Sequence, residues 1–353
     1  MKNSRQRRAR GVLGVLASMV LLGCLAPAYA QDVCLSPWTW PEKTDVGPYT
    51  VYGGQRFSLI VDELKDSVYL KYYDTCIFVD RRLKDGDMLR AYLVINPEYR
   101  KHPQVGSSLW LIHMYYEKDL GSGMLQAGKI PMPFNYRNGF PEYHSQVRRI
   151  TRIWDLGLRY VSKPRGGFTY DLAVVNDGTS PAADSEGYSD KPALVAQVTQ
   201  RFASGAEIGL SGMTAQGREV PAIGEVDFDR VGGHLVVPLG PRTVLRGEYV
   251  AFTSLTQCGP LSPLHANKDG SGFAVEALHQ FTPRSSVFVN YNELERDESL
   301  PNTSVRTFTL GGRYKVSDSF YLIPELWFVN DELPSTDPRR DDNRYILTTL
   351  FLF

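Results

Sequence analysis

The feature of this sequence that most constrains its fold is a two-residue period, because apolar and polar residues alternate along segments of about ten residues. Gly, Pro, Asp and Asn separate these segments. Residues 153–160 show the two faces of such a segment: Trp154, Leu156, Leu158 and Tyr160 on one, Asp155, Gly157 and Arg159 on the other. Alternation of this kind is typical of a half-buried β-strand, so the chain is predicted to be all-β.

Charged residues fall repeatedly on one of the two faces. Residues 242–251 and 307–315 repeat the pattern, with charges opposite aromatic and aliphatic residues. A transmembrane barrel turns apolar side chains to lipid and polar ones inward. The side chains expected to face the lumen are Asp155, Arg159, Arg201, Arg246, Glu248 and Arg313. A soluble β-sandwich would show the same local alternation, so the pattern alone leaves both open.

The number and length of the segments favour a transmembrane antiparallel β-barrel of about sixteen strands, within a range of about 12 to 18. The candidate strands lie near residues 50–62, 67–80, 87–97, 107–117, 122–130, 151–163, 167–176, 192–203, 206–214, 226–238, 242–254, 271–281, 284–294, 304–315, 318–329 and 343–353. Single-chain bacterial barrels have an even number of strands, and strands of about 9 to 11 residues span the outer membrane.

The connections between these segments alternate in length. Short ones include Pro164-Arg165-Gly166, Ser204-Gly205 and Gly240-Pro241, and longer polar stretches such as 177–190 and 255–270 lie between them. Barrels that enter the membrane from the periplasm have short periplasmic turns and longer external loops. The longest connection, residues 131–150, is then the third external loop.

The C-terminus is a strand that ends on an aromatic residue. One of its two faces would carry Tyr345, Leu347, Thr349, Phe351 and Phe353. This ending resembles the signal read by the outer-membrane barrel assembly machinery, which is therefore an expected partner. The alternative is the buried last strand of a soluble domain.

The N-terminus reads as an export signal. Residues 1–30 combine basic residues, an apolar run and Ala28-Tyr29-Ala30, which is a small-x-small cleavage pattern. Residues 31–49 are then a periplasmic lead-in and 50–353 the barrel. No later apolar run approaches the roughly 18 residues of a transmembrane helix. Cleavage leaves 34 basic against 39 acidic residues, a balance that argues against nucleic-acid binding.

Three cysteines follow the signal, namely Cys34, Cys76 and Cys258. An oxidising compartment would permit one disulfide, and the pair that forms it stays open, although Cys34 with Cys76 is one choice. The histidines show no spacing suited to a metal, so neither a metal nor a cofactor is expected.

Two segments resemble strand ends of the phosphate-selective porins. Residues 124–134 contain Gly128, Lys129, Pro133 and Phe134, similar to the Gly-Lys-x-x-x-Pro-Phe pattern of that family. Residues 170–178 resemble its Tyr-x-x-x-x-x-Asn-(x)-Gly strand end, although Asp177, between Asn176 and Gly178, departs from the simpler Asn-Gly form. The resemblance implies a porin, a third loop that folds into the lumen and, for porins of this size, a homotrimer.

The third loop is predominantly basic. Its candidate constriction residues are Arg137, His144, Arg148 and Arg149, with Arg152 just beyond, against one acidic residue, Glu142. A ring of basic side chains favours anions. Inward Arg residues can instead pair with Asp155, Glu248, Glu276 or Glu325 and merely solvate the lumen, so an anion preference and a lumen of paired charges both stay open.

The chain is predicted not to be an enzyme. Tyr143-His144-Ser145 places a His beside a Ser, but neighbours on a strand point to opposite faces. The expected function is passive diffusion of small hydrophilic solutes across the bacterial outer membrane, in contact with lipid and lipopolysaccharide. Two alternatives remain: a barrel that sheathes or scaffolds a partner protein, such as an electron-transfer conduit, and an outer-membrane barrel enzyme.

Overall fold

A computed structural model of the chain describes residues 44–62, 67–83, 85–95, 109–134, 154–176, 192–220, 223–254, 268–295, 304–331 and 343–353. They form a closed antiparallel β-barrel of 16 strands, which confirms the predicted architecture. No helix in these residues is long and apolar enough to cross a membrane.

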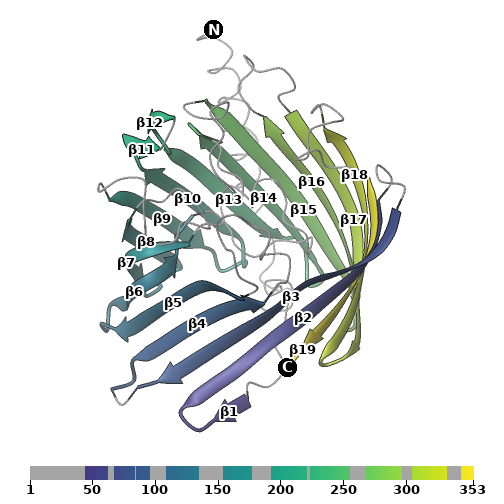
Figure 1. Cartoon of the computed structure of the whole chain (residues 1–353), viewed down its shortest axis with the longest axis horizontal. Helices are drawn as coiled ribbons and strands as arrows, with labels where there is room; N and C mark the ends of the chain where they lie inside the picture. The colour runs from purple at the N-terminus through teal and green to yellow at the C-terminus, as the bar shows by residue number, and fades with distance from the viewer. Residues whose placement is uncertain are drawn as a thin grey trace.

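The barrel strands follow one another around the wall in chain order (Figure 1). They are β2 (Tyr49–Asp62), β3 (Ser67–Arg82), β4 (Met88–Ile95), β5 (Leu109–Asp119), β6 (Gly123–Pro131), β7 (Trp154–Ser162), β8 (Phe168–Val175), β9 (Ala193–Arg201), β10 (Glu207–Thr214), β13 (Arg230–Pro238), β14 (Thr243–Phe252), β15 (Gly270–Thr282), β16 (Ser285–Glu295), β17 (Ser304–Ser317), β18 (Phe320–Asp331) and β19 (Arg344–Leu352). Because every strand pairs with two neighbours, the sheet has no open edge.

The wall closes where the last strand meets the first. β19 pairs with β2 from Arg344↔Asp62 to Leu352↔Gly54. Phe353 extends this seam, since its backbone and that of Gly53 exchange two hydrogen bonds. A closed antiparallel sheet satisfies its backbone polar groups between strands, which a membrane requires.

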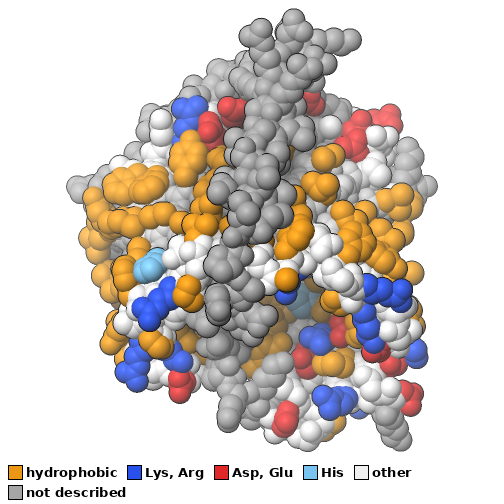
Figure 2. Space-filling view, turned by 180° about the vertical axis from the view of Figure 1, so that it is seen from behind, with side chains coloured by type: hydrophobic (Ala, Val, Ile, Leu, Met, Phe, Trp, Pro, Cys, Tyr) orange, Lys and Arg blue, Asp and Glu red, His pale blue; other side chains and the backbone are white. Residues whose placement is uncertain are grey.

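The two faces of the wall differ as the alternation predicts. Along β7, the side chains of Leu156 and Leu158 are exposed, whereas that of Asp155 is buried. Phe308 and Leu310 on β17 are likewise exposed, and Thr307 and Thr309 are buried. Figure 2 shows hydrophobic side chains in a broad band across the middle of one side, with most charged side chains above and below it. The exposed apolar face is the outside of the barrel.

Connections at one end of the barrel are short. β15 ends at Thr282 and β16 begins at Ser285, and β17 ends at Ser317 and β18 begins at Phe320. We call this the turn end, and the opposite end the loop end. β2 begins and β19 finishes at the turn end, so both termini of the barrel lie there.

Three short strands differ from the predicted segments. β1 (Thr44–Val46) pairs with β2 inside the stretch that was predicted to be a lead-in, because the turn at Gly47-Pro48 folds it back onto a free edge of β2. β11 (Arg218–Val220) and β12 (Gly224–Val226) form a hairpin where a plain loop and the start of a strand were expected. A three-residue strand is too short to be recognised from the alternation of apolar and polar residues.

Candidate channel lining

Polar side chains on the inner face form a connected row across six strands, β3 to β8. The row runs through Asp80, Arg90, Glu117, Gln126, Arg159 and Asp171. Asp80 lies opposite Arg90, Glu117 opposite Gln126, and Gln126 opposite Arg159 in the sheet register. The Cβ atoms of residues that lie opposite each other on neighbouring strands are within about 5.5 Å, so side-chain contacts continue from each strand to the next.

Arg90 joins two carboxylates at the start of this row. Its guanidinium lies 3.2 Å from Glu117 Oε1 and 3.9 Å from Asp80 Oδ2. Gln126 Nε2 donates a hydrogen bond of 2.8 Å to Glu117 Oε2. The acceptor-only carboxylates are therefore matched with donors on both sides.

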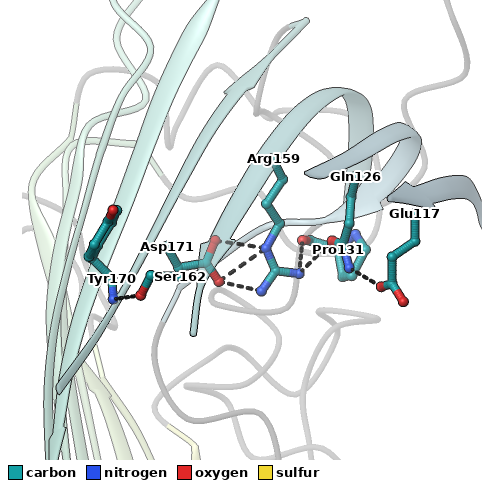
Figure 3. Close-up of polar contacts among 7 residues, drawn as sticks. All are labelled: Glu117, Gln126, Pro131, Arg159, Ser162, Tyr170 and Asp171. Atoms are coloured by element: carbon teal, nitrogen blue, oxygen red, sulfur yellow. Dashed lines mark hydrogen bonds and ion pairs between the residues drawn. The ribbon is translucent and has the colours of Figure 1, made fainter. Parts of the chain in front are cut away.

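Arg159 is the centre of the row (Figure 3). Its Nε donates to both carboxylate oxygens of Asp171, at 2.8 and 3.0 Å, and its Nη2 also pairs with Asp171. Its Nη1 donates to Gln126 Oε1 at 3.3 Å and to the backbone carbonyl of Pro131 at 3.1 Å. A guanidinium held by this fork of contacts is fixed in orientation.

A second polar group lies on the inner face of the next strands, β9, β10 and β13. Arg201 Nη2 lies 2.8 Å from Glu207 Oε2, and His234 Nε2 lies 3.1 Å from Glu207 Oε1. Further along, Asn290 donates to Glu276 at 3.0 Å, and Arg246 lies opposite Glu276 in the register. Charges of both signs therefore alternate around the wall.

Acidic and basic groups of these contacts nearly balance. The β3–β8 row contains three carboxylates and two guanidinium groups, each in contact with the opposite sign. Such pairing leaves a polar surface with a weak net electrostatic field, as expected of a barrel wall that faces a water-filled lumen.

The third loop begins inside the barrel. After β6 ends at Pro131, Met132 and Phe134 are buried at 1% exposure. They belong to an apolar cluster with inward side chains such as Ile130, Val175 and Val195. The contact from Arg159 to the Pro131 carbonyl holds the same point of the chain. The root of the loop is thus held by one polar and one apolar attachment.

The family-motif residues surround this root. Gly128 has a φ of 131°, and a Cβ there would lie 2.5 Å from the Met114 carbonyl, so only glycine fits. Lys129 lies opposite Met114 and Leu156, whose side chains are exposed on the outer face. Pro133 and Phe134 are both buried.

The predicted site residues divide into three groups. Asp155, Arg159, Arg201, Arg246, Glu248 and Arg313 all occupy register positions of the inner face. Tyr345, Leu347, Phe351 and Phe353 are exposed on the outer face. The constriction candidates Arg137, His144, Arg148, Arg149 and Arg152 lie outside the described residues, as do Cys34 and Cys258.

Some partners differ from those that the sequence suggested. Arg159 pairs with Asp171 rather than Asp155, and Arg201 with Glu207. His234 is buried on the inner face against Glu207. Sequence reasoning missed Asp80, Arg90, Glu117, Gln126 and Asp171 as members of the lining. Their parity within the strands was the available signal, but parity does not reveal which strands' residues meet.

Among the parts of the chain that the structure describes, no group of three or more His, Cys, Asp or Glu is placed to hold a metal ion. Cys76 Sγ lies 3.1 Å from Tyr92 Oη on the inner face.

A closed barrel of 16 antiparallel strands, with an apolar outer face and rows of polar side chains inside, is the architecture of outer-membrane porins. Solved structures with this fold match the chain over most of its length. The outer membrane channel DcaP of Acinetobacter baumannii has a TM-score of 0.63 at 14% identity, over 89% of this chain and 100% of that one.

Two further structures agree. An anion-selective porin from Comamonas acidovorans has a TM-score of 0.60 at 12% identity, over 86% of this chain and 99% of that one. Salmonella typhi OmpF, in complex with daunomycin, has a TM-score of 0.65 at 10% identity, over 86% and 97%. No protein-family model matches the chain, and no curated protein matches its sequence. At these identities the likeness shows the shared fold.

Proposed function

We propose that this chain is a porin of the bacterial outer membrane, through which small hydrophilic solutes diffuse passively. The observation that carries the proposal is the contrast between the faces of one closed wall. Leu158 is exposed outside, and its neighbour Arg159 is held in a polar row inside. In a membrane the apolar outer face contacts lipid and the polar inner face contacts water.

Three features support the cellular location. The N-terminal 30 residues carry the export pattern, the chain ends in the aromatic strand that resembles an assembly signal, and the short connections gather at one end. We place the turn end in the periplasm and the loop end outside the cell. Lipopolysaccharide would then contact the outer face near the loop end, and a homotrimer is the proposed assembly.

We assign a preference for anions to the third loop rather than to the wall. The charges of the β3–β8 row and of the Arg201–Glu207 contact are paired, so they contribute little net field. Arg137, Arg148 and Arg149 belong to the loop whose root is buried inside the barrel at Met132 and Phe134. Basic side chains that project into a narrow passage raise the local concentration of anions. A closer relationship to the phosphate-selective porins rests on the Gly128–Phe134 motif alone.

The direct test is planar-bilayer recording of the refolded chain from residue 31, with the reversal potential measured under a salt gradient. Discrete conductance steps are expected, with a reversal potential on the anion-selective side. Arg148→Ala/Arg149→Ala should move that potential toward zero. Arg165→Ala is the matched control, since Arg165 is exposed in the β7–β8 turn and should leave selectivity unchanged.

The outcomes separate the alternatives. Conductance without anion selectivity keeps the porin and removes the role of the third loop. Silence from a barrel that is folded and heat-modifiable rejects the channel and favours a scaffold for a partner protein. Hydrolysis of a lipid or peptide that requires His144 would favour the enzyme.

A further inference from the structure

A second apolar cluster lies on the inner face at the turn end. It comprises Val236, Val244, Leu278, Phe288, Tyr321, Ile323, Leu350 and Leu352, and we call it the turn-end cluster. These side chains come from β13, β14, β15, β16, β18 and β19, and none is more than 5% exposed. A broad part of the inner wall near the periplasmic opening is therefore apolar.

The burial of this cluster requires a cover. The barrel wall is one sheet thick, and outward side chains on the same strands remain open: Leu347 is 41% and Phe351 43% exposed. Inward neighbours such as Leu350 have the same backbone on one side and the barrel interior on the other. Curvature brings inward side chains closer, but eight apolar residues facing water in a lumen would forfeit the hydrophobic gain that burial supplies.

The first described strand leads to this cluster. β1 pairs with Tyr49–Val51 of β2, whose other edge is taken by β3, so β1 occupies the same edge as β19. It runs antiparallel to β2, and Thr44 therefore lies on the side of Gly53 and Phe353. Figure 1 shows β1 at the end of the barrel where the C-terminus lies.

The chain before Thr44 cannot continue in the sheet, because Phe353 and Leu352 already fill the next positions along β2. On the inner face at that rim lie Leu350 and Leu352, which belong to the turn-end cluster. The hairpin is fixed there by a 2.6 Å hydrogen bond from Thr50 Oγ1 to Asp45 Oδ1.

The preceding segment has the composition to cover an apolar surface. Residues 31–43 read QDVCLSPWTWPEK, with Trp38 and Trp40 two positions apart and therefore on one face of an extended chain. Thirteen extended residues reach roughly 40 Å, which is enough to cross a barrel opening. Two prolines restrict the segment and lower the entropy lost on docking.

We propose that residues 31–43 dock inside the barrel on the turn-end cluster, with Trp38 and Trp40 against its apolar side chains. The segment would cover the apolar part of the inner wall at the turn end. The proposal rests on the proposed function insofar as residue 31 begins the exported chain.

Chemical cross-linking from the native Cys34 tests this docking. In the chain from residue 31, Cys76→Ser and Cys258→Ser leave Cys34 as the only thiol. Ile323→Cys then adds a thiol within the turn-end cluster, and Leu322→Cys adds one at the neighbouring position on the outer face of β18. A short bis-maleimide joins the pairs that lie close, and the ring that it closes changes gel mobility.

Ile323→Cys is expected to give at least about tenfold more intramolecular product than Leu322→Cys, because docking raises the effective concentration of Cys34 at the inner face. Equal yields, or no product from either variant, would overturn the proposal. Heat-modifiability establishes folding first, and Leu278→Cys replaces Ile323→Cys if that variant does not fold. The cross-linking readout does not depend on conductance. A barrel that conducts but gives no cross-link would therefore reject the docking proposal and leave the proposed porin function standing.

Discussion

Phe353 and Gly53 exchange backbone hydrogen bonds: Gly53 N–H donates to the Phe353 carbonyl at 2.7 Å, and Phe353 N–H donates to the Gly53 carbonyl at 3.0 Å. The last residue of the chain is therefore part of the seam that closes the barrel. The aromatic terminus that resembles an assembly signal also completes the pairing of the first and last strands.

Gly53→Ala should weaken this seam. A Cβ there would lie 2.3 Å from the Cys76 carbonyl oxygen and 2.8 Å from the Phe353 ring, so strands or ring must shift. We expect a loss of about 1 to 3 kcal/mol in the free energy of unfolding, measured by urea titration in lipid vesicles. Gly212→Ala is the control, because nothing lies within 4 Å of its added Cβ. Equal losses from both would reject the seam as the cause.

Arg159→Ala should destabilise the barrel by on the order of 3 kcal/mol, since Asp171 would remain as a buried carboxylate without its main partner. Both side chains are largely shielded, at 13% and 11% exposure. The double variant with Asp171→Ala should lose less than the sum of the single changes. Lys163→Ala breaks the exposed pair with Asp119 and should change the unfolding free energy little. Additive losses at Arg159 and Asp171 would contradict the coupling.

Phe134→Ala should release the root of the third loop. The ring is almost completely buried in the apolar cluster that also contains Ile130, Val175 and Val195, and its removal should cost about 3 to 5 kcal/mol. Single-channel records should also show larger conductance fluctuations than those of the unaltered chain. Phe168→Ala removes an exposed ring at the turn end and should leave the records quiet. Steady conductance in the Phe134 variant would show that the root does not hold the loop.

Leu158→Arg tests the lipid-facing side. Leu158 lies in the middle of β7 on the outer face, where an Arg costs about 2 to 4 kcal/mol at the centre of a bilayer. Leu120→Arg places the same charge in the β5–β6 turn, where the cost near the interface should fall to about 1 kcal/mol or less. The ratio of the two unfolding free energies in vesicles measures depth. Equal costs would mean that β7 does not face lipid at this level.

The strands and the orientation of their side chains could be predicted from the sequence, because both depend on a local two-residue period of apolar and polar residues. The alternation around Leu156, Leu158 and Arg159 is enough to predict which face of the strand each side chain occupies. The sixteen predicted segments also lie close to the sixteen barrel strands. The same logic placed Phe308 outside and Thr309 inside, without knowledge of any partner strand.

Partners across strands followed a different rule. Asp171 meets Arg159 because β8 is staggered on β7 so that Val161, rather than Arg159, lies opposite Asp171, and the long guanidinium reaches across the diagonal. His234 is buried because its register on β10 brings Gly209 beneath its ring and Glu207 beside it. Neither relationship is visible within a single segment.

The sequence by itself determined that this chain forms amphipathic strands, about how many there are and which side chains face each way, since a period of two acts within a few residues. Only the tertiary structure decided the register of neighbouring strands, the closure at Gly53 and Phe353, the polar row through Arg159 and the buried root at Phe134. These depend on residues brought together from distant parts of the chain, and their stagger is fixed when the whole sheet closes on itself.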